Sequence, residues 1–239
     1  MCGRFALYEK LEKLKEEFPQ VFFPQSLGNN QAENHLPEGN KLEPRYNISP
    51  GTKVLGIAGN SQGMKAGFFH WGLVPAWADN AKTSYKMTNA RAETLGTKKS
   101  YHRAFEQRRC VILANGFFEW LRADSGKAPY FIGLPNHSLF AMAAVWERWL
   151  GPVAESEQPQ ELISTSIITT EASDQMAPIH HRMPILLRPQ QIQAWLYEGY
   201  QHPEEILKPY SGQLEIFPVS ARVNSSRNHG PDLINPLCL

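Results

Sequence analysis

The sequence has few cysteines, and their positions exclude two common uses of this residue. Its 239 residues contain three cysteines, Cys2, Cys110 and Cys238. Three thiols cannot pair completely, and their spacing is not that of metal ligands. We therefore expect free thiols in a reducing compartment, with no metal site and no cofactor.

Long apolar runs are absent as well. No stretch of 18 or more apolar residues occurs, and the N-terminal segment has no basic region followed by an apolar one. These absences argue against a membrane span and a signal peptide. The sequence therefore predicts a cytoplasmic protein that has no membrane partner.

The chain also has almost no net charge. Its value is +1, from 24 Lys and Arg against 23 Asp and Glu. A balance this even argues against non-specific coating of duplex nucleic acid. A nucleic-acid ligand would have to be held by a local basic patch and by aromatic stacking, and we expect modest affinity for undamaged single strands.

The apolar pattern predicts more strands than helices. Apolar residues at helical spacing predict helices over residues 8–18, 98–107, 190–197 and 203–207, with one or two helical turns at 171–177. Alternating and β-branched segments predict strands over 53–58, 64–71, 110–114, 117–122, 129–134, 139–149, 162–170 and 215–219. Hairpin signals stand at 59–63, 115–116, 124–126 and 135–136. We predict one α+β domain over residues 1–239, with a largely antiparallel, barrel-like core, helices packed outside and a long surface loop at 24–45.

The most informative segment is Met1-Cys2-Gly3-Arg4. If Met1 is removed, Cys2 carries a free α-amine and a thiol on adjacent carbons. Such a 1,2-aminothiol traps an aldehyde, because the amine forms an imine and the thiol closes on the same carbon to give a thiazolidine. α-Amines and thiols titrate near about 8 and 8.5, so both groups are available near neutral pH. The competing interpretation is that Cys2 is a small buried apolar residue in a first strand.

Two other segments contain groups that transfer protons. Glu119 stands between Phe118 and Trp120. Burial beside aromatic rings would favour the protonated carboxyl and suit it to general-acid work; alternatively, Glu119 faces solvent, because neighbouring strand residues alternate sides. His180 and Arg182 would suit proton transfer and phosphate binding respectively, although a lone surface histidine is the common case.

Two more groups have competing interpretations. Asn89, Arg91 and Glu93 alternate in an extended segment, which would point them to one side of a strand. They would then line a site or form a solvated strand face. Trp71 and Trp77 stand in a segment that contains Gly and Pro. They are either packed in the core or displayed as a stacking platform for bases.

In this order, these segments resemble the SRAP family, the SOS response-associated peptidase domain. The resemblance is carried by Met1-Cys2-Gly3-Arg4-Phe5, Tyr46-Asn47 with Pro50-Gly51, Trp71-Gly72-Leu73 with Pro75 and Trp77, Asn89-Ala90-Arg91-Ala92-Glu93-Thr94, Gly116-Phe117-Phe118-Glu119-Trp120, His180 with Arg182-Met183-Pro184, and Val219-Ser220 with Val223-Asn224. Each motif is weak alone. Together they cover nearly the whole chain.

The resemblance implies a covalent sensor and shield of abasic sites in single-stranded DNA. The ring-opened sugar of an abasic site carries an aldehyde, which is the electrophile that a 1,2-aminothiol traps. By similarity, Cys2 is the nucleophile and Asn89 orients it. Glu119 serves as acid and base. His180 protonates the sugar oxygen and supports a lyase-like reversal of the adduct.

The resemblance also implies a set of DNA contacts. Arginines would bind flanking phosphates and tryptophans would stack on bases. The residues of this set are Arg4, Asn47, Trp71, Trp77, Arg91, Trp120 and Arg182. We expect a monomer whose partner is single-stranded DNA that contains abasic sites, associated with the nucleoid if the protein is bacterial. The peptidase activity in the family name is understood as removal of Met1, by the chain itself or by a cellular aminopeptidase.

Three other functions remain open from the sequence. Class II glutamine amidotransferases also begin Met-Cys-Gly, and their N-terminal cysteine uses its own amine as base. A non-catalytic single-strand binding protein and a plain cysteine peptidase are the others. Two features depart from the family pattern: His181, where a small polar or acidic residue is frequent, and the loop at 24–45.

Overall fold

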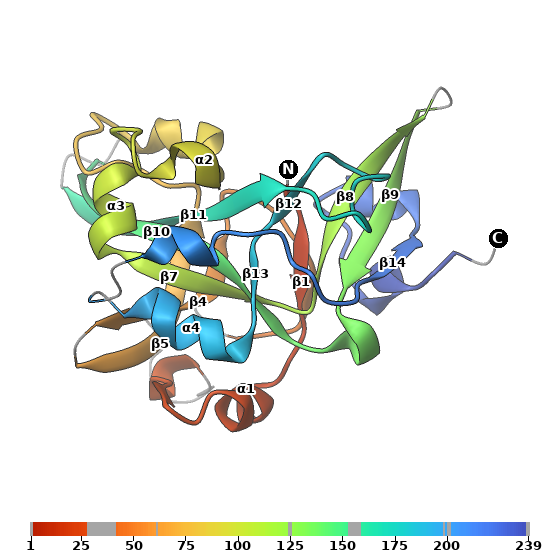
Figure 1. Ribbon diagram of the computed structural model, residues 1–239, viewed down its shortest axis with the longest axis horizontal. Helices are drawn as coiled ribbons and strands as arrows, with labels where there is room; N and C mark the ends of the chain where they lie inside the picture. The colour runs from red at the N-terminus through yellow and green to blue at the C-terminus, as the bar shows by residue number, and fades with distance from the viewer. Residues whose placement is uncertain are drawn as a thin grey trace.

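Two sheets with short helices around them form the protein (Figure 1). The computed structural model describes residues 2–27, 42–60, 62–123, 126–152, 159–197, 199 and 202–237. The predicted α+β class and largely antiparallel sheet are confirmed. Within these ranges, no helix is long and apolar enough to cross a bilayer. Met1, Cys238 and residues 28–41 of the predicted surface loop lie outside the described residues.

The larger sheet contains β2 (Val21–Phe22), β4 (Lys53–Asn60), β5 (Gly63–Trp71), β6 (Asn89–Arg91), β7 (Arg109–Ala114), β10 (Phe140–Gly151), β11 (Gln160–Glu171), β12 (Arg182–Pro184) and β13 (Leu186–Leu187). Its main order is β12-β11-β10-β7-β4-β5-β2, and β11 also pairs in parallel with β5. Strands β11, β10, β7, β4 and β5 therefore form a closed ring. The predicted barrel-like core is confirmed, and closure protects these strands from edge pairing.

The smaller sheet contains β1 (Phe5–Leu7), β3 (Arg45–Ile48), β8 (Gly116–Ala123), β9 (Gly126–Gly133) and β14 (Glu215–Pro218). Its order is β14-β9-β8-β1-β3, and all neighbouring pairs are antiparallel. The predicted hairpin between β8 and β9 is confirmed, and it extends away from the barrel in Figure 1. The hairpin predicted at 135–136 is wrong, because β9 belongs to this sheet and β10 to the barrel.

Short helices surround the two sheets. The α-helices are α1 (Leu11–Glu17), α2 (Ala92–Leu95), α3 (His102–Gln107) and α4 (Pro189–Leu196). The 3-10 helices are η1 (Gln25–Leu27), η2 (Ala81–Lys86), η3 (Pro135–His137), η4 (Pro203–Ile206), η5 (Ala221–Asn224) and η6 (Pro231–Ile234). The helices predicted at 8–18 and 98–107 are present as the shorter α1 and α3. The helix predicted at 190–197 is α4, shifted by one residue, and the fourth is the 3-10 helix η4. At 171–177 the predicted helical turn is present as a single turn, in which the backbone nitrogen of Ala177 donates a hydrogen bond to the carbonyl of Ser173 at 2.8 Å; it does not extend into a helix.

The hairpin predicted at Asn115-Gly116 is also wrong, because the chain crosses there from the barrel to the smaller sheet. The Asn115 side chain is buried, and its Oδ1 accepts a hydrogen bond from the backbone nitrogen of Tyr8 at 3.0 Å. Its Nδ2 donates to the carboxylate of Glu9 at 3.0 Å. A Cβ at Gly116 would overlap the ring of Phe131. Burial at the crossing explains these two residues, and turn geometry does not.

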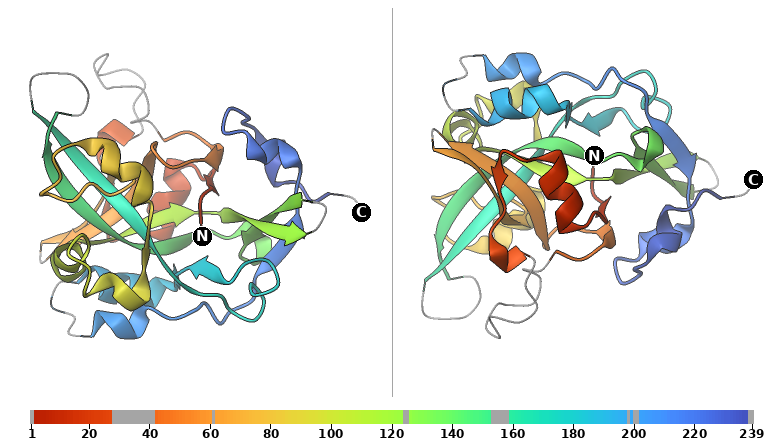
Figure 2. Two further views of the ribbon diagram at one scale, coloured as in Figure 1. Left: turned by 90° about the horizontal axis from the view of Figure 1, so that it is seen from above. Right: turned by 90° about the horizontal axis from the view of Figure 1, so that it is seen from below.

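Strand β8 separates two hydrophobic clusters. The main cluster joins the two sheets and includes Phe5 and Phe117 together with Trp71 of the barrel. A second cluster lies on the other face of the smaller sheet and contains Ala6, Phe118, Phe131, Val219 and Val223. Both faces of β8 are therefore buried over much of its length. The N-terminus lies between the barrel and the β8–β9 hairpin, as the views of Figures 1 and 2 agree.

Candidate active site

The first residues of the chain run along β8. Strand β1 pairs antiparallel with β8. This pairing continues before β1, because the backbone nitrogen of Phe118 donates a hydrogen bond to the carbonyl of Arg4 at 2.9 Å. The residues that precede Arg4 therefore run beside Glu119, and Cys2 lies in the same region as this carboxyl group.

Asn89 connects Cys2 to the barrel. It begins β6, which pairs with β11, and its Nδ2 donates a hydrogen bond to the backbone oxygen of Cys2 at 2.9 Å. The hydroxyl of Tyr101 donates to the backbone oxygen of Asn89 at 3.3 Å. The buried Oδ1 of Asn89 accepts no hydrogen bond from the residues that the structure describes. Cys2 is thus held between β8 on one side and β6 on the other.

The thiol of Cys2 is fully buried. Its Sγ lies 3.9 Å from the backbone oxygen of Arg4. Burial raises the pKa of this thiol far above its ordinary range, and the nearby charge of Glu119 raises it further. Because the thiolate is the reactive form of cysteine, chemistry at Cys2 requires a neighbouring group that accepts the proton.

Glu119 is 3% exposed, although it follows the fully buried Phe118 on the same strand. The sequence left open whether the Glu119 side chain is buried or faces solvent, and in the structure it is buried. The charge of Glu119 raises the pKa of Cys2 and acts in the same direction on His180. The carboxylate of Glu119 thus affects the pKa values of both groups and lies close enough to interact electrostatically with each.

His180 is half-buried in the segment before β12. Its Nδ1 accepts a hydrogen bond from the backbone nitrogen of Arg182 at 2.9 Å and lies 3.1 Å from the carbonyl of the same residue. Its ring stacks on that of His181, with centroids 4.4 Å apart. Burial lowers the pKa of His180 below its ordinary value, against an opposing effect of Glu119. The imidazole is therefore mainly neutral at pH 7, with Nδ1 placed to accept in that form and to donate when protonated.

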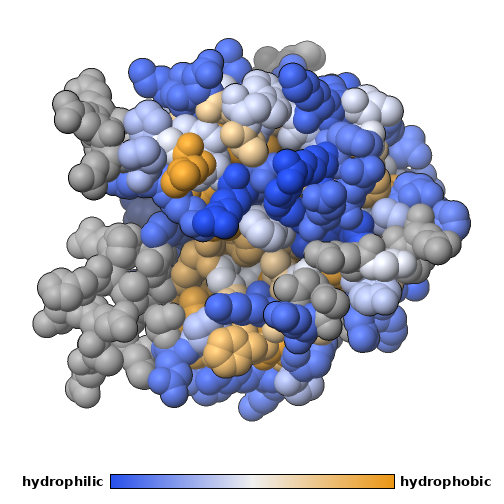
Figure 3. Space-filling view, turned by 90° about the vertical axis from the view of Figure 1, so that its left-hand side faces the viewer, coloured by the Kyte–Doolittle hydropathy of each residue, from blue (hydrophilic) through white to orange (hydrophobic). Residues whose placement is uncertain are grey.

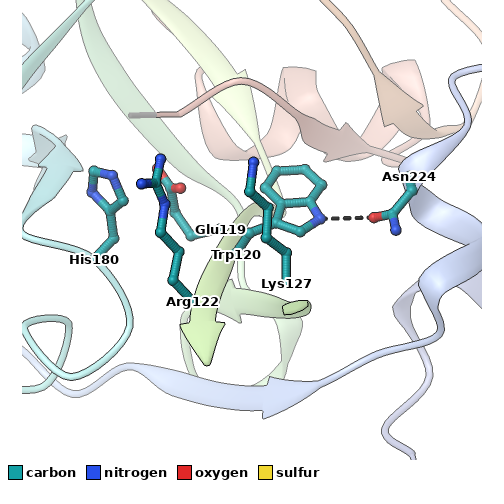
Figure 4. A pocket seen from close by; sticks show the side chains of 6 residues that line it. All are labelled: Glu119, Trp120, Arg122, Lys127, His180 and Asn224. Atoms are coloured by element: carbon teal, nitrogen blue, oxygen red, sulfur yellow. Dashed lines mark hydrogen bonds between the residues drawn. The ribbon is translucent and has the colours of Figure 1, made fainter. Parts of the chain in front are cut away.

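A cleft of about 380 Å³ contains these proton-transfer groups. It is lined by Glu119, Trp120, Arg122, Lys127, His180 and Asn224. Figure 4 shows that the side chains come from β8, β9, the segment before β12 and the C-terminal region. Nε1 of Trp120 donates a hydrogen bond to the Asn224 side chain at 2.7 Å. A carboxyl and an imidazole in one open cleft are suited to moving protons on a bound ligand.

A cleft of similar size, about 370 Å³, has a different lining. Its residues are Phe22, Ala58, Gly59, Gln62, Gly63, Met64, Lys65, Gln107 and Trp146. This lining contains no carboxyl or imidazole group.

The barrel side of the molecule, away from the β8–β9 hairpin, has a mainly hydrophilic surface with an apolar area in its lower half (Figure 3). Among the described residues, no three His, Cys, Asp or Glu side chains are grouped as metal ligands would be.

Two residues of the expected DNA-binding set hold the fold together. Nη1 of Arg4 donates to Oδ1 of Asn47 at 2.7 Å and to the backbone oxygen of Val223 at 2.9 Å. Asn47 is buried, and its Nδ2 donates to backbone oxygens that include Ser225 at 2.9 Å and Asn228 at 3.0 Å. The polar atoms of Asn47 thus bind the C-terminal segment in this structure, and its expected contact with DNA stays a prediction. The half-buried Arg4 is engaged in the same contacts.

The two tryptophans of the predicted platform differ. Trp71 is fully buried, its Nε1 donates to the backbone oxygen of Thr88 at 2.9 Å, and its ring meets that of Phe5 edge to face. Stacking of Trp71 on a base is therefore excluded in this structure, because no face of its ring is exposed. Trp77 is 56% exposed, with the ammonium of Lys99 5.3 Å from its ring centroid. Trp77 is absent from the lining of the cleft.

The predicted extended segment ends earlier than expected. Strand β6 ends at Arg91, and Glu93 belongs to α2, so the prediction that alternation places Asn89, Arg91 and Glu93 on one strand face is wrong. Arg91 is exposed. Arg182 instead forms two hydrogen bonds with the carboxylate of Glu93, at 2.6 and 3.0 Å, and a third with the Thr169 backbone oxygen at 2.7 Å. A phosphate at Arg182 would compete with Glu93.

Sequence reasoning missed two cationic residues of the cleft, Arg122 and Lys127. The available signal was the hairpin itself. Arg122 stands two residues after Trp120, on the same side of β8, and the antiparallel register of β8 with β9 places Lys127 opposite Arg122. Asn224 also has a place in the cleft that its motif alone did not indicate.

Comparison with known proteins gives the family. A family-wide sequence profile described as SOS response associated peptidase (SRAP) matches residues 1–226. The chain belongs to the SRAP family. The resemblance inferred from the motifs is thereby confirmed over nearly the whole chain.

Relatives within the SRAP family come from bacteria and animals. The abasic site processing protein YoqW of Bacillus subtilis is 36% identical over 239 residues, which cover 98% of this chain and 99% of that protein. The abasic site processing protein HMCES of Gallus gallus is 30% identical, over 99% of this chain and 78% of that protein. The abasic site processing protein YedK of Escherichia coli is 28% identical, over 99% of this chain and all of that protein.

Solved structures share the fold. A crystallised protein from Bacteroides thetaiotaomicron superimposes with a TM-score of 0.79 at 24% identity, over 99% of this chain and 100% of that one. A protein from Bordetella bronchiseptica gives a TM-score of 0.72 at 19% identity, over 92% and 100% of the two chains. The SRAP chain described here therefore has a fold that is also known from crystals.

Proposed function

We propose that this protein senses and shields abasic sites in single-stranded DNA by forming a covalent bond through Cys2. The observation that supports this most directly is the position of Cys2, which is held by Asn89 and lies within the electrostatic reach of Glu119. Glu119 and His180 line an open cleft in which an extruded sugar would have room. The relatives named as abasic site processing proteins support the same substrate.

The proposed reaction requires no oxidant and no cofactor. After Met1 is removed, the α-amine of Cys2 attacks the aldehyde carbon of the ring-opened sugar and water leaves, which gives an imine. The S–H of Cys2 then adds across the C=N bond: sulfur bonds to carbon and the proton ends on nitrogen. The product is a thiazolidine, and one water molecule is released for each adduct.

Each nearby group would have a distinct part in this sequence. Glu119 would accept the thiol proton and deliver a proton to the departing hydroxyl. His180 would protonate the sugar oxygen during ring opening and would support the reverse reaction. Asn89 would fix the Cys2 backbone, and its Oδ1 would accept a hydrogen bond from the new α-amine. Trp120 would stack on a neighbouring base.

We further propose that the peptidase chemistry of the family description refers to removal of Met1. This step is hydrolysis of the Met1–Cys2 peptide bond, catalysed by the chain itself or by a cellular aminopeptidase. Mass spectrometry of the wild-type protein and the Glu119→Gln variant separates the two routes. Retention of Met1 in Glu119→Gln alone would support self-removal, whereas its loss from both would support the aminopeptidase.

A denaturing gel tests the proposed function. The wild-type protein is incubated with a single-stranded oligonucleotide that contains one abasic site, in parallel with Cys2→Ser and with an intact strand. We expect a heat-stable adduct only for the wild type with the abasic strand. If no adduct forms, glutamine hydrolysis, the alternative function of an N-terminal cysteine, becomes the next assay. If Cys2→Ser forms the same adduct, the proposed role of Cys2 is wrong.

A further inference from the structure

Two cations face each other on the hairpin that lines the cleft. In the antiparallel pairing of β8 with β9, Arg122 lies directly opposite Lys127. Both residues are exposed, and both line the 380 Å³ cleft that contains Glu119 and His180. Figure 4 shows both side chains extending along the cleft, with Lys127 drawn beside Trp120 and Arg122 drawn between Trp120 and His180. The hairpin thus presents two positive charges to whatever occupies the cleft.

This pairing is unfavourable for the hairpin itself. Like charges placed directly opposite on neighbouring strands destabilise a sheet, whereas opposite charges stabilise it. Among the described residues, neither Arg122 nor Lys127 forms an ion pair, although other exposed cations such as Lys13 and Arg148 do. An anionic ligand in the cleft would relieve the repulsion, so the arrangement suits ligand binding better than stability.

The neighbouring residue on the same face is aromatic. Along β8, Trp120 and Arg122 point to the same side, and the register pairs them with Pro129 and Lys127 respectively. Trp120 is partly exposed and fixed by its hydrogen bond to Asn224. An aromatic ring followed by two cations matches the combination that binds single-stranded nucleic acid, with stacking for a base and positive charge for the backbone.

We propose that Arg122 and Lys127 form a phosphate-binding subsite for the DNA strand where it leaves the active-site cleft. The identity of the ligand as DNA rests on the function proposed above; the position of the subsite rests on the hairpin. With a net charge of +1, the protein as a whole attracts DNA little. This pair therefore supplies a local basic patch next to the reacting group. It binds phosphate without reading the base sequence.

Salt dependence measures this subsite directly. Binding of a fluorescent single strand without an abasic site is measured at several salt concentrations, for the wild type and for Arg122→Gln/Lys127→Gln. Each phosphate contact contributes a slope of about −0.7 to log K against log salt for single strands. Loss of two contacts makes the slope less negative by about 1.4. Between about 50 and 200 mM salt, the wild type then loses roughly sevenfold more affinity than the variant.

The control variant removes the same charge elsewhere. Lys13→Gln/Lys15→Gln changes two exposed cations on α1, which lies at the bottom of Figure 1, away from the β8–β9 hairpin at the upper right. We expect its slope to equal that of the wild type. The hairpin variant should also keep the wild-type Tm or exceed it, because it removes a like-charge pair. Equal slopes for the hairpin variant and the wild type, or equal reductions in both variants, would overturn the subsite.

The two proposals fail in distinguishable ways. The salt measurement uses an intact strand, so it does not depend on chemistry at Cys2. If the wild type forms the covalent adduct but the slope of the hairpin variant is unchanged, the subsite is wrong and the shielding function stands. If the hairpin variant has the less negative slope but the wild type forms no adduct, the subsite stands and the shielding function is wrong.

Discussion

Nδ2 of Asn89 donates a hydrogen bond to the backbone oxygen of Cys2 at 2.9 Å. This contact joins the N-terminal segment of the smaller sheet to β6 of the barrel. The position of the proposed nucleophile therefore depends on how the two sheets pack together. Mutations on either side of this contact test the account.

Replacing Asn89 with Ala removes that contact and leaves the thiol intact. A hydrogen bond of this kind is worth about 1 kcal/mol, which corresponds to roughly a fivefold lower rate of adduct formation. Quenched time courses on denaturing gels measure the rate. An unchanged rate at saturating DNA would show that Asn89 does not position Cys2.

Glu119→Gln should change two observables in opposite directions. The variant loses the charge that raises the pKa of the Cys2 thiol, so alkylation of Cys2 by iodoacetamide should proceed at lower pH than in the wild type. Adduct formation on abasic DNA should nevertheless slow by about 10²-fold or more, because the variant lacks the proposed acid and base.

The same variant has an internal control. The charge of Glu119 raises the pKa of His180, so an NMR titration should show a lower pKa for His180 in Glu119→Gln. The reference is the NMR signal of His102, which lies beside Glu106 on α3 and does not line the cleft. An unshifted His180 would indicate that the carboxyl and the imidazole do not interact.

Release of the adduct should depend on pH through His180. Burial lowers the pKa of His180 below 6.5, so its protonated form increases only as the pH falls below that value. If protonated His180 drives reversal, release of a preformed adduct should accelerate over this acidic range. His181→Gln removes a neighbour whose charge lowers the pKa of His180 and should shift the profile to higher pH. A pH profile unaffected by His180→Gln would contradict this role.

Asn47→Ala tests the structural role found for Asn47. The buried side chain donates hydrogen bonds to several backbone oxygens of the C-terminal segment. Its loss should cost about 1–3 kcal/mol of folding free energy, or roughly 2–4 °C in Tm for each kcal/mol. Below the transition, affinity for single-stranded DNA should remain within about twofold of the wild type. A large loss of affinity at unchanged Tm would instead indicate a direct DNA contact.

Local patterns in the sequence predicted the elements better than their connections. The hairpin between β4 and β5 and the hairpin between β8 and β9 follow from alternation and turn residues, and both are confirmed. The Asn115-Gly116 pair has the composition of a hairpin turn, yet it lies at a crossing between sheets. The Asn115 side chain accepts a hydrogen bond from the backbone nitrogen of Tyr8, and a side chain at position 116 would overlap the ring of Phe131. Such reasons depend on contacts distant in sequence, which a local pattern does not contain.

The site shows a similar division. The chemistry proposed for Cys2 follows from its position in the chain, and the sequence left the burial of Glu119 open. The burial of Trp71 was not readable, because a tryptophan near Gly and Pro suits both a core and a stacking platform. Arg122 and Lys127 become a pair only through the register of β8 with β9. Their charge was visible in the sequence, but pairing them also required the exact register of the predicted hairpin.

The mass of the covalent product tests the central claim most directly. The intact protein is measured before and after incubation with a single-stranded oligonucleotide that contains one abasic site. The account predicts a protein without Met1 and an adduct whose mass is the sum of protein and DNA minus one water, formed without a reducing agent. It also predicts that Cys2→Ala forms no such product. A stable adduct of the same mass in Cys2→Ala, or a wild-type adduct that appears only after borohydride reduction, would contradict thiazolidine formation at Cys2.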